Sequence, residues 1–164
     1  MKQRQLRFGK AFGWCWNRRS QAAEKSFDKI TEDNETKADL VKEICHELKV
    51  HTAIEEKILY PAARGAMDDT DLLDESDVEH ASAKQLIPDL ETTPPGDDSY
   101  DTKATVLAEY IRHHVKKEQN EMFPKIRQTN LDLKELDARL RQRRNELASS
   151  ATERPAPSGA ATSA

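Results

Sequence analysis

Apolar side chains recur along this chain at steps of three and four residues, which places them on one face of an α-helix. The first such segment begins at about residue 20, and its face carries Ser20, Ala23, Phe27 and Ile30. The second runs from about residue 36 to 66, and its face carries Val41, Ile44, Leu48, His51, Glu55, Ile58 and Ala62. Alternating steps of three and four form a seam of the kind that helices use to pack in bundles.

Two further segments have the same spacing. The third runs from about residue 71 to 90, and its face carries Leu73, Ser76, His80, Ala83, Ile87 and Leu90. Pro88 lies in its last turn, where a proline should kink or fray the helix. After a proline-rich loop at 92–99, the fourth segment runs from about residue 100 to 128, with a face of Leu107, Ile111, His114, Glu118 and Met122.

Four amphipathic segments joined by short polar breaks predict an all-α fold, an antiparallel up-down-up-down four-helix bundle over residues 20–128. Residues 1–19 have no clear period and form an atypical N-terminal segment. Residues 129–148 again have helical spacing and predict a short C-terminal extra helix docked outside the bundle. Residues 149–164 are rich in Ala, Ser, Thr and Pro, so a disordered tail is expected.

Composition agrees with helices and narrows the classes of function. The 164 residues are 34% charged and 5% aromatic, and only five are glycine, which does not suit a β-sandwich. A net charge of −4 argues against nucleic-acid binding. No apolar run approaches the roughly 18 residues of a membrane span, and no signal peptide is apparent. Cys15 and Cys45 have no pairing pattern, which predicts reduced thiols in a cytoplasmic protein.

Histidine and glutamate side chains occupy positions on the apolar seams of the second, third and fourth segments. His51, His80 and His114 each lie on the seam of their own helix, although a single such histidine is more often a satisfied core residue than a ligand. Glu55 and Glu118 lie on the seams one turn after His51 and His114. A carboxylate in a bundle core is costly unless its charge is compensated, and a bound cation does this most simply. Imidazole suits iron, zinc and copper.

The chain also contains an internal repeat. Residues 51–64 read HTAIEEKILYPAAR, and residues 114–127 read HVKKEQNEMFPKIR. At equal offsets both contain a histidine, a glutamate, an aromatic residue, a proline and an arginine. Because the second and fourth helices of such a bundle are diagonal, the repeat predicts a pseudo-twofold site with one carboxylate from each side, as in two-metal centres. The two prolines, Pro61 and Pro124, are expected to shape the end of the bundle.

The segments HTAIEEKILYP, VEHASAKQLI and HHVKKEQNEMFP resemble the metal-binding helices of bacterial hemerythrin-like (HHE cation-binding) domains, over about residues 20–128. The resemblance implies a non-haem diiron centre that meets O₂ or peroxide. Carried over by position, the metal ligands are His51, Glu55, His80, His114 and Glu118, with the two glutamates as bridging carboxylates. His113 is not carried over, since its partner one turn later is Lys117.

One position departs from the family pattern. The first helix of the family carries a histidine seven residues before an aromatic residue, and counting back from Phe27 gives Ser20. The expected role of the centre is carriage, sensing or iron and redox homeostasis, and the open position offers the alternative of a peroxide-decomposing enzyme. Alternatively, the site holds one metal or none, and the chain is a metal-depleted helical interaction module. The sequence does not identify protein partners or the oligomeric state.

Overall fold

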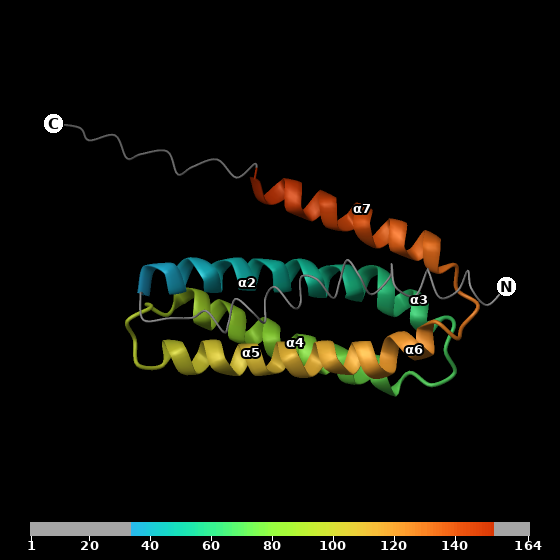
Figure 1. The fold of residues 1–164 in the computed structure, drawn as a ribbon, viewed down its shortest axis with the longest axis horizontal. Helices are drawn as coiled ribbons and strands as arrows, with labels where there is room; N and C mark the ends of the chain where they lie inside the picture. Colours follow the sequence, from blue (N-terminus) through green and yellow to red (C-terminus); the bar gives the residue numbers. More distant parts are fainter. Residues whose placement is uncertain (1–33, 153–164) are drawn as a thin grey trace.

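The computed structural model describes residues 34–152, and within this range every regular element is helical (Figure 1). The elements are α2 (Asn34–Ile54), η1 (Glu55–Leu59), α3 (Tyr60–Arg64), α4 (Asp71–Thr92), α5 (Tyr100–Lys117), η2 (Glu118–Met122), α6 (Phe123–Ile126) and α7 (Leu133–Thr152). The predicted all-α class is confirmed. The expected first helix with Ser20, residues 1–19 and the end of the predicted tail lie outside the described residues, so the complete four-helix arrangement stays a prediction.

Three long rods form the body of the described structure. The first is α2, η1 and α3 in continuous succession, the second is α4, and the third is α5, η2 and α6. Figure 1 shows them side by side, with α4 running in the opposite direction to the other two, and both α2 and α5 contact α4. Short turns at 65–70 and 93–99 connect the rods. Neighbouring rods can therefore place side chains from three helices at one level.

Both of the interrupted rods contain a π-helical turn at the same offset of the sequence repeat. The Tyr60 N–H donates to the Glu55 carbonyl and the Phe123 N–H to the Glu118 carbonyl, five residues back in each case. One residue after each wide turn comes a proline, Pro61 or Pro124. A proline lacks an N–H and clashes with the carbonyl four residues earlier in a regular helix. A π-turn accommodates the proline without ending the rod.

The π-turn also shifts the buried face of the first rod by one residue. The regular spacing predicted Ile58 and Ala62 on the seam, but both are only partly buried, whereas Leu59 and Ala63 are buried. This part of the predicted seam is wrong because an extra residue in the wide turn rotates everything after Glu55. Before the turn, the seam from Val41 to Glu55 is buried as predicted.

Helix α4 follows its predicted pattern closely. All six residues of the predicted face are buried: Leu73, Ser76, His80, Ala83, Ile87 and Leu90. Pro88 does not end the helix, which continues to Thr92, and Leu90 beyond it is 1% exposed. The burial of Leu90 therefore holds the last turn in place despite the missing N–H of Pro88.

Two apolar clusters lie on either side of a polar middle section. The first comprises Val41, Ile44, Cys45, Leu48, Ala83, Ile87, Leu90, Tyr100, Ala104, Leu107, Ala108, Ile111 and Val115. The second comprises Leu59, Tyr60, Ala63, Leu73, Met122, Phe123, Ile126 and Leu136. On each rod the polar seam residues fall where one cluster gives way to the other, so the site lies between two apolar layers.

The C-terminal helix α7 packs outside the rods, against α2 and η1, as the spacing predicted. Leu136 anchors it in the second cluster, and Asp132 caps its start by accepting the N–H groups of Lys134 and Glu135. The helix extends to Thr152, beyond the expected end near 148. Between residues 34 and 152, no helix combines the length and the apolar character needed to cross a membrane.

Candidate metal centre

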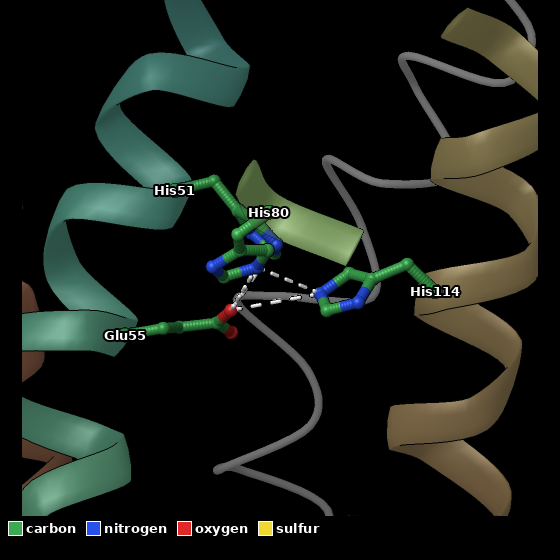
Figure 2. Close-up of side chains that lie close together, drawn as sticks. All are labelled: His51, Glu55, His80 and His114. Carbon is green, nitrogen blue, oxygen red and sulfur yellow. Dashed lines mark hydrogen bonds and ion pairs between the residues drawn. The ribbon is translucent and has the colours of Figure 1, made fainter. Parts of the chain in front are cut away.

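Three rods each bring one histidine to the same level of the interior (Figure 2). His51 comes from α2, His80 from α4 and His114 from α5, and none is more than 8% exposed. Glu55, one turn after His51, completes a group of four buried residues whose ligand atoms all lie within 4.8 Å of one another. Four of the five predicted ligands are thus brought together by the fold.

The three imidazoles converge on a single carboxylate oxygen. The Nε2 atoms of His51, His80 and His114 lie 3.2, 3.3 and 3.7 Å from Glu55 Oε2. His80 Nε2 and His114 Nε2 are 3.1 Å apart. The same nitrogen of every ring therefore faces the centre, an arrangement that aims three ring nitrogens at one point.

The fifth predicted ligand, Glu118, lies beside this group. It is fully buried, and its Oε1 lies 3.7 Å from His114 Nε2. It is not a member of the group within 4.8 Å. Its role as a bridging ligand therefore stays a prediction, although the carboxylate is next to the centre.

The pKa values of the buried groups are set by burial together with contacts between imidazoles and carboxylates. Burial would raise the pKa of Glu55, but His51 and the hydrogen bonds with His114 and His80 outweigh it and hold the pKa well below its usual range. Burial holds the pKa of His51 well below its ordinary value. Burial also disfavours protonated His114, yet Glu118, Glu55 and Glu79 together raise its pKa to about 11. A carboxylate charge here thus depends on a cationic neighbour, which can be an imidazolium or a metal ion.

The phenol ring of Tyr60 packs against one side of the centre. The Tyr60 hydroxyl donates to Glu55 Oε2 over 3.1 Å and lies 3.3 Å from His80 Nε2, with its ring stacked on that of His80. Burial and the nearby carboxylates raise the pKa of Tyr60, so the group remains a hydrogen-bond donor at neutral pH. Tyr60 belongs to the second apolar cluster and thus joins that cluster to the site.

Two glutamates that the seam pattern missed contact the outer nitrogens of the rings. Glu56 Oε1 lies 3.2 Å from His80 Nδ1, and Glu79 Oε2 lies 2.8 Å from His114 Nδ1. Neither falls on an apolar seam, which is why the spacing did not select them. The sequence did offer one signal for them, since Glu56 directly follows the predicted ligand Glu55 and Glu79 directly precedes the predicted ligand His80.

The remaining candidates from the sequence lie apart from the centre. His113 is 66% exposed and contacts Glu79 from outside, so it points elsewhere, as its spacing predicted. Glu75 and Glu79 form a surface group with His113, but Lys117 is paired with Glu75 there. Cys45 is a buried thiol whose pKa burial raises to about 11, and Cys15 lies outside the described residues.

The donor set and its spacing fit a cation. Two ligand atoms bound to one ion at about 2.0–2.2 Å lie roughly 3–3.6 Å apart. The closest separations in this group are 3.1–3.3 Å, which need only small adjustments. Three imidazoles with carboxylate oxygens are ligands suited to iron, zinc or copper, and the apolar layers on both sides would limit access of water.

A comparison with protein families agrees with this chemistry. The family model described as hemerythrin HHE cation binding domain matches residues 17–126, a range that contains all five predicted ligands. Comparisons with curated proteins and with solved structures gave no match. The matched range covers more than half of the 164 residues.

Proposed function

This chain belongs to the hemerythrin HHE cation-binding family, and from that premise we propose that it binds non-haem iron as a diiron centre that interacts with O₂ or peroxide. The role would be carriage, sensing or iron and redox homeostasis in the cytoplasm. The ligands would be His51, Glu55, His80, His114 and Glu118. We also propose that the segment from residue 20 supplies the first helix of an antiparallel up-down-up-down bundle.

The convergence of three Nε2 atoms on Glu55 Oε2 is the observation that carries the proposal. A structural role would be served by one histidine paired with one carboxylate. Three imidazoles that present the same nitrogen to one oxygen in a buried interior form instead a set of donors aimed at a shared point. A cation at that point would balance both buried carboxylates, Glu55 and Glu118.

The sequence repeat supports two metal ions rather than one. His51 with Glu55 and His114 with Glu118 have the same four-residue spacing and each pair precedes a π-turn. In a pseudo-twofold arrangement of this kind, each histidine–glutamate pair would hold one ion, and Glu55 and Glu118 would supply the bridging carboxylates. His80 supplies a third imidazole from α4.

The protein would control the reactivity of the ions through its own groups. Iron, when bound, supplies the redox change and the affinity for O₂ or peroxide. The two apolar clusters exclude bulk water, and the Tyr60 hydroxyl holds Glu55 Oε2 in position by a hydrogen bond. Tyr60 could also donate a hydrogen bond to a ligand that enters the centre.

Peroxide decomposition is the second candidate, favoured by Ser20 at the place where the family has a histidine. A ligand set short of one imidazole leaves a coordination position for water or peroxide. Steady consumption of peroxide above that of free iron would distinguish this enzyme from a carrier or sensor. A metal-depleted interaction module is the third candidate, and the burial of Glu55 and Glu118 counts against it because no apolar replacement has relieved their charge.

The deciding measurement is the iron content and absorption spectrum of protein purified from iron-supplemented cells. His114→Ala removes one converging ligand, and His46→Ala is the matched control because His46 is exposed on α2. We expect two irons per chain with near-ultraviolet absorption in the wild type and the control, and loss of both in His114→Ala. Equal iron content in all three proteins would contradict the proposed site, and a wild type without iron would favour the metal-depleted module.

A further inference from the structure

Two ligand histidines use their two ring nitrogens in the same way. His80 and His114 turn Nε2 inward to within 3.1 Å of each other, and each turns Nδ1 outward to a glutamate. The outer distances are 3.2 Å from His80 Nδ1 to Glu56 and 2.8 Å from His114 Nδ1 to Glu79. Both rings are therefore held between the centre on one side and a carboxylate on the other.

Each outer glutamate comes from a different rod than the histidine it contacts. Glu56 follows Glu55 on η1 and reaches His80 on α4, whereas Glu79 precedes His80 on α4 and reaches His114 on α5. One glutamate thus links the first rod to the second, and the other links the second rod to the third. The orientation of a ligand ring in one helix consequently depends on the position of its neighbour.

Both glutamates are themselves anchored from the surface. Lys84 Nζ donates to Glu56 Oε2 over 2.6 Å, and His113 Nε2 lies 3.4 Å from Glu79 Oε1. The side chains of Glu56 and Glu79 are 30% and 17% exposed, so they lie at the boundary between the buried rings and the surface. Glu79 uses Oε2 for the ligand ring and Oε1 for His113. Lys84, by contrast, lies within 2.6 Å of both Glu56 oxygens, including the Oε1 that contacts His80.

We propose that Glu56 and Glu79 are positioning residues, each of which accepts the Nδ1–H of a ligand histidine and so leaves its Nε2 lone pair facing the metal ion. The proposal rests on the proposed metal binding and extends it to two residues outside the ligand set. A neutral imidazole carries one N–H, and the acceptor beside a ring decides which nitrogen carries it. Removal of such an outer partner typically weakens metal binding about 10- to 100-fold.

A structural alternative would treat the two carboxylates as ordinary surface partners of Lys84 and His113. Exposed contacts of that kind contribute little to stability, and their contribution would not depend on the histidine ring behind them. The two explanations predict different effects on metal affinity when glutamine replaces the glutamate. A glutamine carbonyl still accepts an Nδ1–H but forms no ion pair, so Glu79→Gln separates the roles.

The test uses zinc(II) as a diamagnetic probe on the full chain. Zinc affinity is measured by competition with a chelator, and ¹⁵N imidazole NMR of the zinc-loaded protein reports the Nδ1–H of each ring. The variants are Glu56→Ala, Glu79→Ala and Glu79→Gln. Glu75→Ala is the matched control, since Glu75 is an exposed glutamate one turn before Glu79 on α4 and contacts neither ligand ring.

We expect zinc affinity to fall about 10- to 100-fold in each alanine variant and to be largely retained in Glu79→Gln and Glu75→Ala. The NMR change should be reciprocal, with the His114 Nδ1–H signal altered only in Glu79→Ala and the His80 signal only in Glu56→Ala. Wild-type affinity with unchanged ring signals in both alanine variants would overturn the positioning role alone. Equal weakening in Glu79→Gln and Glu79→Ala with intact ring signals would also overturn it. A wild type that binds neither zinc nor iron would instead refute the proposed function itself.

Discussion

The Tyr60 hydroxyl donates a hydrogen bond to the same Glu55 oxygen on which the three imidazoles converge. In a regular α-helix, residues five apart point about 140° away from each other. The π-turn between Glu55 and Tyr60 changes this angle and lets the two side chains meet. The wide turn that accommodates Pro61 therefore also builds one wall of the centre.

Tyr60→Phe should remove this hydrogen bond without disturbing the packing of the ring. The equivalent position of the repeat is Phe123, which shows that a phenylalanine ring fits after such a turn. Loss of one buried hydrogen bond costs about 1 kcal/mol, so the free energy of unfolding of the metal-free protein should fall by that amount. Urea denaturation measures it. Tyr110→Phe, at a position 44% exposed, is the control, and an equal loss there would count against the explanation.

Glu118→Gln tests whether this glutamate bridges two ions. Gln has the shape of Glu but lacks the charge that a bridging carboxylate contributes, so we expect the iron content to fall from two per chain toward one or none. In the metal-free protein, the substitution also removes the carboxylate that most raises the pKa of His114. Elemental analysis gives the iron content. A variant with two irons and an unchanged absorption spectrum would show that Glu118 is not a ligand.

The stability of the metal-free protein should depend on pH through His114. Its pKa is raised to about 11 against an ordinary value of 6.5, so the folded protein holds a proton that the unfolded chain releases between these values. The stabilisation is complete below about pH 6.5 and is lost as the pH rises toward 11. Hence His114→Gln should destabilise more near pH 6 than near pH 10, as measured by urea denaturation with a chelator present. A difference that grows with pH would have the wrong sign.

Leu107→Ala should show how far stability depends on the first apolar cluster rather than on metal. Leu107 is fully buried in α5, and removal of a buried leucine side chain costs about 2–5 kcal/mol because it leaves a cavity. The neighbouring Val106, 36% exposed, provides the control Val106→Ala, whose cost should be clearly smaller. Chemical denaturation of both metal-free variants decides the point. Equal losses would mean that the cluster is not packed as described.

The sequence alone predicted the helices of the described part of the chain and most of the side chains that meet in the candidate centre, since both depend on local spacing. Apolar side chains at steps of three and four identified the seam from Val41 to Glu55, the whole buried face of α4 and the buried face that runs from α5 into η2. Histidines on those seams had to point inward with the apolar residues around them. The spacing alone therefore selects His51, His80 and His114.

Only the tertiary structure determined the burial and contacts of residues that are next to seam positions in the sequence. The shift from Ile58 to Leu59 follows from a π-turn whose extra residue breaks the regular period. Glu56 and Glu79 contact the candidate centre because a neighbouring rod brings a histidine nitrogen to each of them. Periodicity reports which face of a helix is buried, whereas contacts between helices depend on how the rods are placed in space, and that placement comes from packing over residues far apart in the chain.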